Sequence, residues 1–545
     1  MSTNLPAEPV LDIRGLTVRL PAGADRPFAI EDVTIAVRPR ELVCVVGESG
    51  SGKSVTALAT MGLLAPQLTP AAGSIRLDGE ELLEARRARL RALRGSRMSM
   101  IFQEPMTALN PVMTAGQQID EVLSLHSDLA PGARTRRILE VMAEVNLPEP
   151  ERLRHAYPHQ LSGGQRQRVM IAMALALNPR LLIADEPTTA LDVTTQAQIL
   201  GLIKRIQREH DMGVLFITHD FGVVAEVADR VAVMQNGRIV ETGDTTDILS
   251  TPRHGYTRML ITAVPSLVPR HREARDGAPI VLATHGLAKT YGGGGFFQRA
   301  REVRAASDVD IAVRRGETLG IVGESGSGKT TVARCLVRLV EPTDGRIELH
   351  GRDIGGLRER LLRRYRKQIQ IIFQDPYRSL NPRRTVGQSI VEGPTNYGVP
   401  RAQARLEARE LLELVSIDPG ALDRYPHQFS GGQRQRIAIA RALAMRPDVL
   451  VADEAVSALD VSVQAQVLDL LDDIRRRFDL AIVFITHDLR VAAQICDTIA
   501  VMYQGEVVEA GRAAEVFANP RHEYTRTLFD AAPGRHWNFS AFRAA

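Results

Sequence analysis

The feature that most constrains the fold of this chain is an internal repeat. The segment Tyr-Pro-His-Gln-Leu-Ser-Gly-Gly-Gln-Arg-Gln-Arg at 157–168 recurs at 425–436 with one change, from Leu161 to Phe429. Two near-identical copies this far apart indicate a duplicated domain. In each copy a small polar residue and two glycines precede an apolar helical run, which places backbone N–H groups at a helix N-terminus, where anions bind. Taken alone, either copy fits an ordinary Ser N-cap with a Gly-rich turn equally well.

Other residues recur in the same order around this segment. Upstream of it, Gln103 follows Lys53 by 50 positions, and Gln374 follows Lys329 by 45. The halves are collinear from the segment onward, because three pairs are each 268 positions apart: Ser162 and Ser430, Asp185 and Asp453, and His219 and His487.

The length of 545 residues is too great for a single hydrophobic core. We assign one domain to 1–265 and a second to 280–545. Between them, 266–279 is rich in Pro, Arg and Gly and has no apolar periodicity, which is typical of a linker.

The apolar pattern of each half predicts an α/β domain. Short β-branched runs at 41–46 and 317–322 have the character of buried parallel strands, and each leads into a Gly-rich turn and a helical run. We therefore expect two tandem P-loop domains, each with a parallel-sheet core. Further strands are expected at 11–20, 181–184, 213–217, 280–291, 449–452 and 481–485, and helices at 55–64, 138–147, 331–340 and 408–417.

Both Gly-rich turns fit the pattern of a phosphate-binding loop. Consecutive backbone N–H groups wrap the phosphate oxygens in such a loop, a Lys adds positive charge, and a Ser or Thr hydroxyl ligates Mg²⁺. Because two copies each follow a buried strand, the interpretation as a purely structural Gly turn is rejected. The expected phosphate-binding residues are Gly47, Glu48, Ser49, Gly50, Ser51, Gly52, Lys53 and Ser54, and Gly323, Glu324, Ser325, Gly326, Ser327, Gly328, Lys329 and Thr330.

Polar residues at later strand ends complete the expected chemistry. In each half an Asp that suits Mg²⁺ is followed by a Glu that suits polarising the attacking water, a Gln ends an apolar run, and a His follows a strand where it can touch the γ-phosphate. Seen singly, an acidic pair is usually solvated, a Gln is surface and a His before Asp is a turn residue. The repeated order favours the catalytic interpretation. The expected catalytic residues are Glu186, His219, Glu454, His487, Gln103 and Gln374, and the expected metal ligands are Ser54, Gln103, Asp185, Thr330, Gln374 and Asp453.

Composition narrows the class of function. Apolar residues make up 44% of the chain and charged residues 24%, which is typical of a globular protein. A formal charge of +4 is too small to imply nucleic acid or an anionic membrane. The longest apolar run, 169–177, is shorter than the roughly 20 residues that span a bilayer. The three cysteines, Cys44, Cys335 and Cys496, lie in separate apolar runs, so we expect reduced core residues.

The ordered motifs resemble the nucleotide-binding domains of ATP-binding cassette (ABC) proteins across almost all of both halves. They match the Walker A, Q-loop, Leu-Ser-Gly-Gly-Gln signature, Walker B, D-loop (190–192 and 458–460) and switch His of that family. The resemblance implies an antiparallel β subdomain and a helical subdomain beside each parallel core. It also implies that ATP and Mg²⁺ bind as cofactors between the P-loop of one half and the signature of the other. The signature residues expected at these sites are Ser162, Gly163, Gly164, Gln165, Ser430, Gly431, Gly432 and Gln433.

Three departures from the family pattern stand out. Phe429 replaces the usual Leu of the signature, which is expected to alter packing rather than phosphate contact. Tyr291 is expected to stack on adenine in the second half, whereas Leu20 stands at that position in the first, which leaves Phe28 or no aromatic there. Many relatives carry a C-terminal cysteine cluster; the chain has none, so we expect no iron–sulfur cluster.

Within the family, the chain is similar to the ATPases of peptide, glutathione, opine and nickel importers. The segments that carry this similarity are 102–111, 373–382, 453–466 and the tails Arg-His-Gly-Tyr-Thr-Arg at 253–258 and Arg-His-Glu-Tyr-Thr-Arg at 521–526. The similarity implies an ATP-hydrolysing subunit with no membrane span of its own, peripheral at the cytoplasmic face of the bacterial inner membrane. Its implied partners are two multi-span permease subunits, which dock on the loops after the two Gln residues, and an extracytoplasmic solute-binding protein, with no nucleic acid.

The alternative is a soluble tandem ABC ATPase that acts on ribosomes. Such proteins carry a long charged helical linker and usually Asn-His before the Leu-Asp of the D-loop. Here the linker is short, and Thr189-Ala190 and Ser457-Ala458 precede Leu-Asp. These features favour the importer.

Overall fold

The computed structural model describes residues 8–189, 191–272, 275–292, 302–457, 459–537 and 539. The chain divides into two compact units, the first of residues 1–262 with 533–545 and the second of residues 263–532. Several sequence predictions fall outside the described residues. These are the first D-loop residue of each half, Ala190 and Ala458, and residues 273 and 274 of the expected linker.

Two sheets organise the first unit. A mainly parallel sheet has the strand order β10-β9-β3-β8-β7-β6, and an antiparallel sheet has the order β2-β1-β4-β5. Strands β3, β7 and β8 are buried along their whole length, as expected for β-branched strands that are covered on both faces. The strands are β1 (Leu11–Arg19), β2 (Phe28–Val37), β3 (Leu42–Val46), β4 (Thr69–Leu77), β5 (Glu80–Glu81), β6 (Met98–Ile101), β7 (Leu181–Asp185), β8 (Gly213–Thr218), β9 (Arg230–Gln235) and β10 (Arg238–Asp244).

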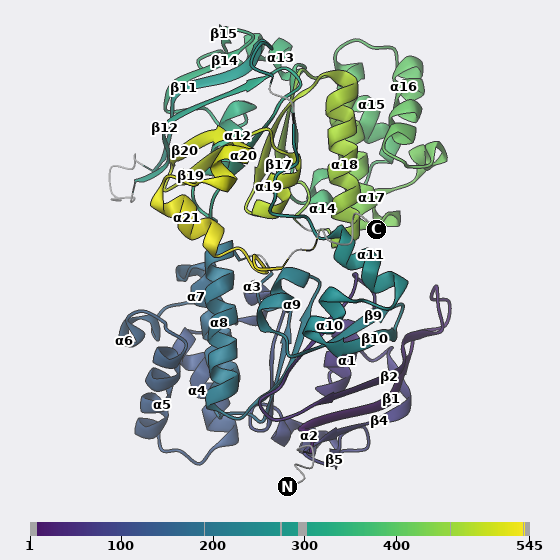
Figure 1. Ribbon diagram of the computed structural model, residues 1–545, viewed down its shortest axis with the longest axis vertical. Helices are drawn as coiled ribbons and strands as arrows, with labels where there is room; N and C mark the ends of the chain where they lie inside the picture. Colours follow the sequence, from purple (N-terminus) through teal and green to yellow (C-terminus); the bar gives the residue numbers. More distant parts are fainter. Residues whose placement is uncertain are drawn as a thin grey trace. The chain divides into compact units, whose positions relative to one another are not determined.

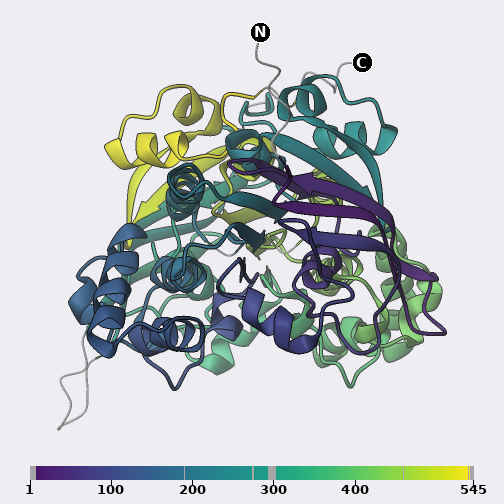
Figure 2. The ribbon, with the colours of Figure 1, turned by 90° about the horizontal axis from the view of Figure 1, so that it is seen from below.

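The helices of the first unit divide into two groups. Figures 1 and 2 show α4, α5 and α6 on the side of the unit opposite the long antiparallel strands, which are drawn in purple. This arrangement confirms the implied helical and antiparallel subdomains. The helices are α1 (Lys53–Thr60), α2 (Arg87–Leu93), α3 (Pro105–Ala108), α4 (Ala115–His126), α5 (Pro131–Glu144), α6 (Pro150–Leu153), α7 (Gly163–Leu175), α8 (Val193–Glu209), α9 (Phe221–Val227), α10 (Thr245–Ser250) and α11 (Gly255–Ala263).

The second unit repeats this plan. Its sheets have the orders β16-β17-β18-β13-β19-β20 and β12-β11-β14-β15. Its strands are β11 (Ile280–Tyr291), β12 (Val303–Arg314), β13 (Thr318–Val322), β14 (Asp344–Leu349), β15 (Arg352–Asp353), β16 (Ile369–Ile372), β17 (Val449–Asp453), β18 (Ala481–Thr486), β19 (Thr498–Tyr503) and β20 (Glu506–Arg512). Its helices are α12 (Lys329–Leu336), α13 (Glu359–Arg366), α14 (Pro376–Ser379), α15 (Val386–Asn396), α16 (Arg401–Leu414), α17 (Gly431–Leu443), α18 (Val461–Phe478), α19 (Leu489–Ile495), α20 (Ala513–Ala518) and α21 (Glu523–Asp530).

Helix ends differ from the sequence predictions. Helices α5 and α16 end at Glu144 and Leu414, three residues before the predicted ends. The cause is backbone conformation, because Asn146 and Ser416 have φ values of 56° and 57° in the left-handed region, which terminates a helix. The helices after the Gly-rich turns begin two residues earlier than predicted, directly after the last loop glycine, and also end earlier, at Thr60 and Leu336.

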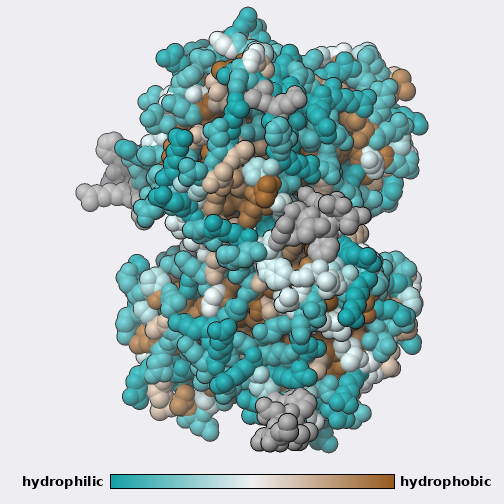
Figure 3. Space-filling model, viewed as in Figure 1, coloured by the Kyte–Doolittle hydropathy of each residue, from teal (hydrophilic) through white to brown (hydrophobic). Residues whose placement is uncertain are grey.

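One hydrophobic core joins the two sheets within each unit. In the first unit, Leu11 and Ile13 of the antiparallel sheet belong to the same buried cluster as Val43, Val45 and α1 side chains. All three cysteines are buried, as the sequence predicted. Among the described residues no helix combines the length and hydropathy needed to cross a bilayer, and the face shown in Figure 3 is largely hydrophilic.

The described residues between 266 and 279 belong to the second unit and are hydrogen-bonded to its helices. Arg270 Nε donates to Gln494 Oε1 at 3.1 Å, and Arg272 Nη1 donates to Asp472 Oδ1 at 2.8 Å. Side chains of α18 and α19 therefore fix the described part of this segment.

Candidate functional site

Sheet order brings the predicted site residues to one edge of each parallel sheet. In the first unit, β3, β8, β7 and β6 are neighbouring parallel strands. The Gly-rich loop follows β3, His219 follows β8, Asp185 ends β7 and Gln103 lies two residues after β6. The carboxyl ends of parallel strands are where ligands of such sheets bind. The second unit has the same arrangement on β13, β18, β17 and β16.

The loop after β3 depends on glycine at its first position. Gly47 has φ of 154°, and a Cβ there would lie 2.2 Å from the carbonyl oxygen of Met234, at the end of β9. Gly323 has φ of 152° and the same 2.2 Å conflict with Met502 O. Only glycine lets the loop backbone approach the neighbouring strand this closely.

The ammonium group of a buried lysine, the first residue of the following helix, contacts the backbone of each loop. Lys53 Nζ donates to Gly47 O at 2.7 Å and to Glu48 O at 2.9 Å. Lys329 Nζ donates to Gly323 O at 2.8 Å and to Glu324 O at 2.6 Å. Each ammonium group is thus held within the loop whose N–H groups are suited to phosphate.

A hydroxyl and a carboxylate meet beside each loop. Ser54 Oγ donates to Asp185 Oδ1 at 3.1 Å, and Thr330 Oγ1 donates to Asp453 Oδ1 at 3.3 Å. Burial raises the pKa of both aspartates, an effect that exceeds the opposing hydrogen bonds from the hydroxyls. Hard oxygen ligands from a carboxylate and a hydroxyl are the set that Mg²⁺ prefers, so these residues fit the predicted ion.

Three side chains hold the glutamate that follows each aspartate. Around Glu186, Gln103 Nε2 donates to Oε2 at 2.9 Å, Thr189 Oγ1 donates to Oε2 at 3.0 Å, and His219 Nδ1 lies 3.1 Å from Oε1. The backbone of Glu186 is in the left-handed region, with φ of 46°. A non-glycine residue in this conformation is uncommon, and such residues gather at functional sites.

The second unit repeats the constellation with one change. Gln374 Nε2 donates to Glu454 Oε2 at 2.6 Å, and His487 Nδ1 lies 3.2 Å from Oε1. Glu454 has φ of 48°. Ser457, however, donates its hydroxyl to the backbone oxygen of Glu454 rather than to the carboxylate.

These contacts determine the charge state of the glutamate and histidine. Burial raises the pKa of Glu186, but the hydrogen bond and charge of His219 outweigh it and lower the pKa to about 2. Burial lowers the pKa of His219, yet Glu186 raises it above its ordinary value. The pKa shifts of Glu454 and His487 have the same directions and causes. Each pair therefore joins an ionised carboxylate to an imidazole whose protonated form the glutamate stabilises.

The repeated segment forms a capped helix start in each unit. Ser162 Oγ accepts from Gln165 N at 3.2 Å, and Gln165 Oε1 accepts from Ser162 N at 3.0 Å, a capping box at the start of α7. Ser430 and Gln433 form the same box at α17. The cap uses the N–H of the glutamine and not those of the two glycines. The Ser N-cap interpretation is therefore confirmed, and the anion-site interpretation of the glycine N–H groups stays a prediction.

The departures from the family pattern have local structural explanations. Phe429 is buried, and the guanidinium of Arg424 lies 4.5 Å from its ring centre. Tyr291 ends β11 with 41% of its surface exposed, and Lys289 Nζ lies 5.2 Å from its ring centre. Leu20 is partly buried against the core of the first unit, and Phe28 pairs with Arg19 at the end of the same hairpin.

Four residues that touch the site were missed by sequence reasoning. Arg26 Nη2 donates to Gly50 O at 2.6 Å, so the β1–β2 hairpin reaches the Gly-rich loop. Thr189 holds Glu186, and Tyr256 and Tyr524 contact the second residue of each loop. The repeated Tyr-Thr in the tails was the one sequence signal for these tyrosines, and nothing in it indicated which residues they contact.

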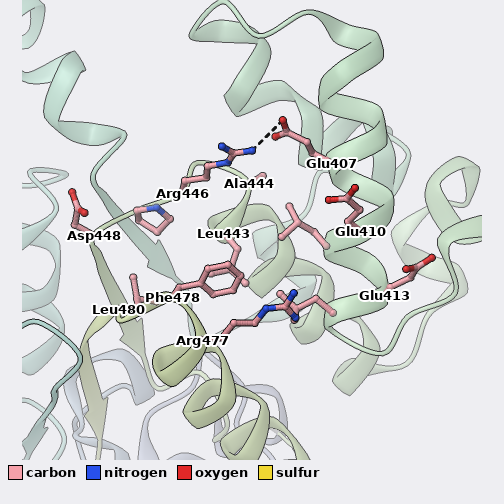
Figure 4. Close-up of a pocket in the computed structure, with 13 residues that line it drawn as sticks. Glu407, Glu410, Glu413, Leu443, Ala444, Arg446, Asp448, Arg477, Phe478 and Leu480 are labelled. Carbon is pink, nitrogen blue, oxygen red and sulfur yellow. Dashed lines mark ion pairs between the residues drawn. The ribbon is translucent and has the colours of Figure 1, made fainter.

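A pocket of about 880 Å³ in the second unit lies away from this chemistry. Figure 4 shows Glu407, Glu410 and Glu413 projecting from α16 on one side, with Phe478 and Arg477 near the floor. Arg446 forms an ion pair with Glu407 at 3.2 Å. No residue of the Gly-rich loop, the Asp-Glu pair or the His lines it, so the pocket is not the predicted site.

The sequence of the chain is similar to those of known transporter proteins over most of its length. The ABC transporter family matches residues 30–189 and 306–457, and the oligopeptide/dipeptide transporter C-terminal region matches 240–306 and 508–538. The peptidoglycan transport ATP-binding protein YejF of Agrobacterium fabrum is 47% identical over 96% of this chain and 96% of its own length. The glutathione import ATP-binding protein GsiA of Escherichia coli is 46% identical over 98% of this chain and 91% of its own length. A solved structure of the ATP-binding cassette MJ0796, bound to ADP and Pi, is 28% identical over 43% of this chain and 98% of its own, with a TM-score of 0.39.

Proposed function

The chain belongs to the ABC transporter ATP-binding proteins and is an ATPase, and from this premise we propose that it drives a bacterial importer of peptides or related small solutes. The observation that carries the proposal is the presence, in both units, of the same complete set of loop Lys, Asp-Glu pair, Gln and His. A chain that used only one site would not need to hold both glutamates in this way.

The residues have distinct tasks in ATP hydrolysis. The loop N–H groups and Lys53 bind the phosphate oxygens of ATP, as Lys329 does in the second unit. When bound, Mg²⁺ neutralises phosphate charge, and Ser54 with Asp185 would hold it. Glu186 is ionised near neutral pH and is aimed by Gln103 and His219, so it orients and polarises the attacking water.

We propose further that each signature completes the ATP site of the other half. The glycine N–H groups of the capped helix start are suited to the γ-phosphate. The test uses ATP retained by chains whose hydrolysis is blocked by Glu186→Gln and Glu454→Gln. Adding Ser162→Arg with Lys329→Ala should remove about half of the retained ATP, because both belong to one composite site. Adding Ser162→Arg with Lys53→Ala should remove nearly all of it, and equal losses in the two chains would contradict the composite arrangement.

The proposed partners are two multi-span permease subunits at the cytoplasmic face of the cell membrane and an extracytoplasmic solute-binding protein. The names of YejF and GsiA place those relatives in peptidoglycan transport and glutathione import, and the match to the oligopeptide/dipeptide transporter region points to the same class of solute. None of these matches supports the ribosome-acting alternative, and it is not proposed.

The experiment is affinity purification of the tagged full chain from detergent-extracted membranes. We expect two multi-span proteins to co-purify and to dissociate when the loop after Gln374 is altered by Tyr377→Ala with Arg378→Ala. Sedimentation with ribosomes and absence of membrane subunits would contradict the proposal. Uptake of labelled glutathione and of small peptides by cells with and without the chain would then identify the solute.

A further inference from the structure

A tyrosine from the C-terminal helix of each unit hydrogen-bonds the Gly-rich loop. The Tyr256 hydroxyl, from α11, accepts from Glu48 N at 3.2 Å and donates to Glu48 Oε2 at 3.2 Å. In the second unit the Tyr524 hydroxyl, from α21, accepts from Glu324 N at 3.1 Å. Each tyrosine is about 200 residues from its loop partner, 208 in the first unit and 200 in the second. The same contact therefore occurs in both units of the duplicated fold.

A second hydrogen-bond network fixes the position of each tyrosine. Glu241 of β10 accepts from the backbone N–H groups of Arg253 at 2.7 Å and His254 at 3.1 Å, and His254 Nδ1 accepts from Tyr256 N at 3.2 Å. The same three bonds recur in the second unit, where Glu509 of β20 accepts from Arg521 N and His522 N, and His522 Nδ1 accepts from Tyr524 N. The Arg-His-x-Tyr-Thr tails are thus anchored to an edge strand of the parallel sheet.

Glu48 contacts both the tyrosine hydroxyl and the phosphate-binding lysine. Glu48 O accepts from Lys53 Nζ at 2.9 Å, while the N–H and carboxylate of the same residue engage Tyr256. Tyr256 is only 7% exposed, so its ring is held by packing and its hydroxyl is not free to turn to solvent. The position of the helix α11 is consequently transmitted to the loop backbone that surrounds Lys53.

The chemistry of the loop explains why such a support is needed. A phosphate-binding loop favours anions, and the carboxylate of Glu48 is an anion within it that repels phosphate. A hydrogen bond from the tyrosine hydroxyl holds this carboxylate toward α11, and the bond from Glu48 N fixes the direction of the peptide group. Loss of the hydroxyl would remove both of these hydrogen bonds.

The geometry points to Tyr256 and Tyr524 as positioning residues that set the Gly-rich loop for nucleotide, and so to a role for the C-terminal segments in tuning ATP affinity. Both tyrosines lie in the stretches that match the oligopeptide/dipeptide transporter C-terminal region. The inference rests on the proposed ATPase function. It assigns to these segments an action on the ATP site of their own unit.

The test is Tyr256→Phe with Tyr524→Phe in the full chain, with ATP hydrolysis and binding of a fluorescent ATP analogue as readouts. Phe keeps the ring and removes only the hydroxyl. We expect the KM for ATP to rise about fivefold, which corresponds to about 1 kcal/mol of binding free energy, with kcat within about twofold. The melting temperature without nucleotide should change little. The matched control is Tyr503→Phe, because the Tyr503 hydroxyl accepts from Gln504 Nε2 and its ring packs on Tyr524 without reaching the loop.

A double-mutant cycle separates positioning from packing. Glu48→Ala removes the carboxylate that accepts from the Tyr256 hydroxyl, so Glu48→Ala and Tyr256→Phe should have effects on ATP affinity that are clearly non-additive. An unchanged KM, or additive effects together with a lowered melting temperature, would show that the tyrosine only supports folding and would overturn the inference. Absence of ATP hydrolysis in the unaltered chain would instead contradict the proposed function, so the two failures are distinct.

Discussion

The Gly-rich loop and the helical region of the two units have diverged to very different degrees. At the loop, the lysine to first-glycine oxygen distances are 2.7 and 2.8 Å, and the hydroxyl to aspartate distances are 3.1 and 3.3 Å. In the helical region the seventh residue of two 14-residue helices has changed from a cation to an anion, Arg137 in α5 and Glu407 in α16. The contacts of the phosphate-binding loop are therefore the same in both units, whereas the side chain at this helix position has been replaced.

That replacement changes the surface of the second unit. Arg137 donates to Ala176 O at 3.0 Å, to Leu175 O at 3.3 Å and to Asn178 Oδ1 at 2.8 Å, so a guanidinium caps the C-terminus of α7. Glu407 cannot donate to the equivalent carbonyls, pairs with Arg446 instead, and lines the open pocket of Figure 4. A cation at a helix C-terminus is a small stabilising contribution, and its loss was tolerated.

The largest effects are expected from the loop glycines, and they should be equal in the two units. Gly47→Ala and Gly323→Ala each place a Cβ 2.2 Å from a backbone oxygen, so each should abolish measurable ATP binding in its own unit, at a strain of roughly 3 kcal/mol or more. The control is Gly79→Ala, outside the Gly-rich loop and between β4 and β5, where φ is also positive but no atom lies within 4 Å. Titration with a fluorescent ATP analogue measures the effect. Loss of one bound nucleotide per chain in Gly323→Ala but not in Gly47→Ala would break the equivalence of the loops.

A smaller effect should expose the one difference between the two glutamates. Thr189→Val removes a hydrogen bond to the Glu186 carboxylate, whereas Ser457→Ala removes one to a backbone oxygen. We expect steady-state ATP hydrolysis to fall about three- to tenfold for Thr189→Val, in line with one charge-assisted hydrogen bond, and to stay within about twofold for Ser457→Ala. Equal losses from the two substitutions would show that the extra bond has no role in aiming the carboxylate.

Substitutions in the helical region should change the free energy of unfolding and leave ATP hydrolysis unchanged. Arg137→Ala removes three hydrogen bonds to the end of α7 and should lower the free energy of unfolding of the first unit by about 1–2 kcal/mol. Glu407→Ala breaks a largely exposed ion pair and should change it by less than about 0.5 kcal/mol. Urea unfolding, followed by hydrogen exchange resolved to each unit, measures both. Similar values for the two would contradict the capping role of Arg137.

The smallest effect is a pH dependence shared by both units. The pKa values of His219 and His487 are raised above 6.5 in the folded state, so the folded chain binds these protons more tightly than the unfolded chain does. This stabilisation is complete below pH 6.5 and is lost as the pH rises through the raised values. We expect the melting temperature of the nucleotide-free chain to fall by a few degrees across that range. The chain with His219→Gln and His487→Gln should have a flatter profile, and an unchanged profile would exclude the pair as its source.

The sequence was enough to predict the strands and the edge where the site forms. Buried β-branched runs are recognisable, and the carboxyl ends of parallel strands meet at one edge, so residues such as Asp185 and His219 were expected to converge. The contact of His219 with Glu186 could not be predicted, because it depends on β8 lying between β3 and β7. Strand order is decided by tertiary packing and leaves no local pattern.

Other features were beyond the sequence for related reasons. Tyr256 reaches Glu48 across 208 residues, and the bonds from Arg253 N and His254 N to Glu241 of β10 fix the start of the helix that carries Tyr256. The ends of α5 and α16 were placed three residues too late, because the left-handed conformations of Asn146 and Ser416 interrupt runs that continue to look helical. Apolar periodicity predicts which residues are buried, but it does not predict where a helix ends.

The most direct test of the central claim, that both units carry a working catalytic glutamate, is ATP hydrolysis by Glu186→Gln, Glu454→Gln and the double variant, with Glu209→Gln at the exposed end of α8 as the control. We expect each single substitution to reduce turnover strongly, and the double variant to lose about 100-fold or more while ATP affinity stays within about threefold. The control should retain full turnover. Hydrolysis by the double variant at more than about a tenth of the unaltered rate would contradict the assignment of both glutamates.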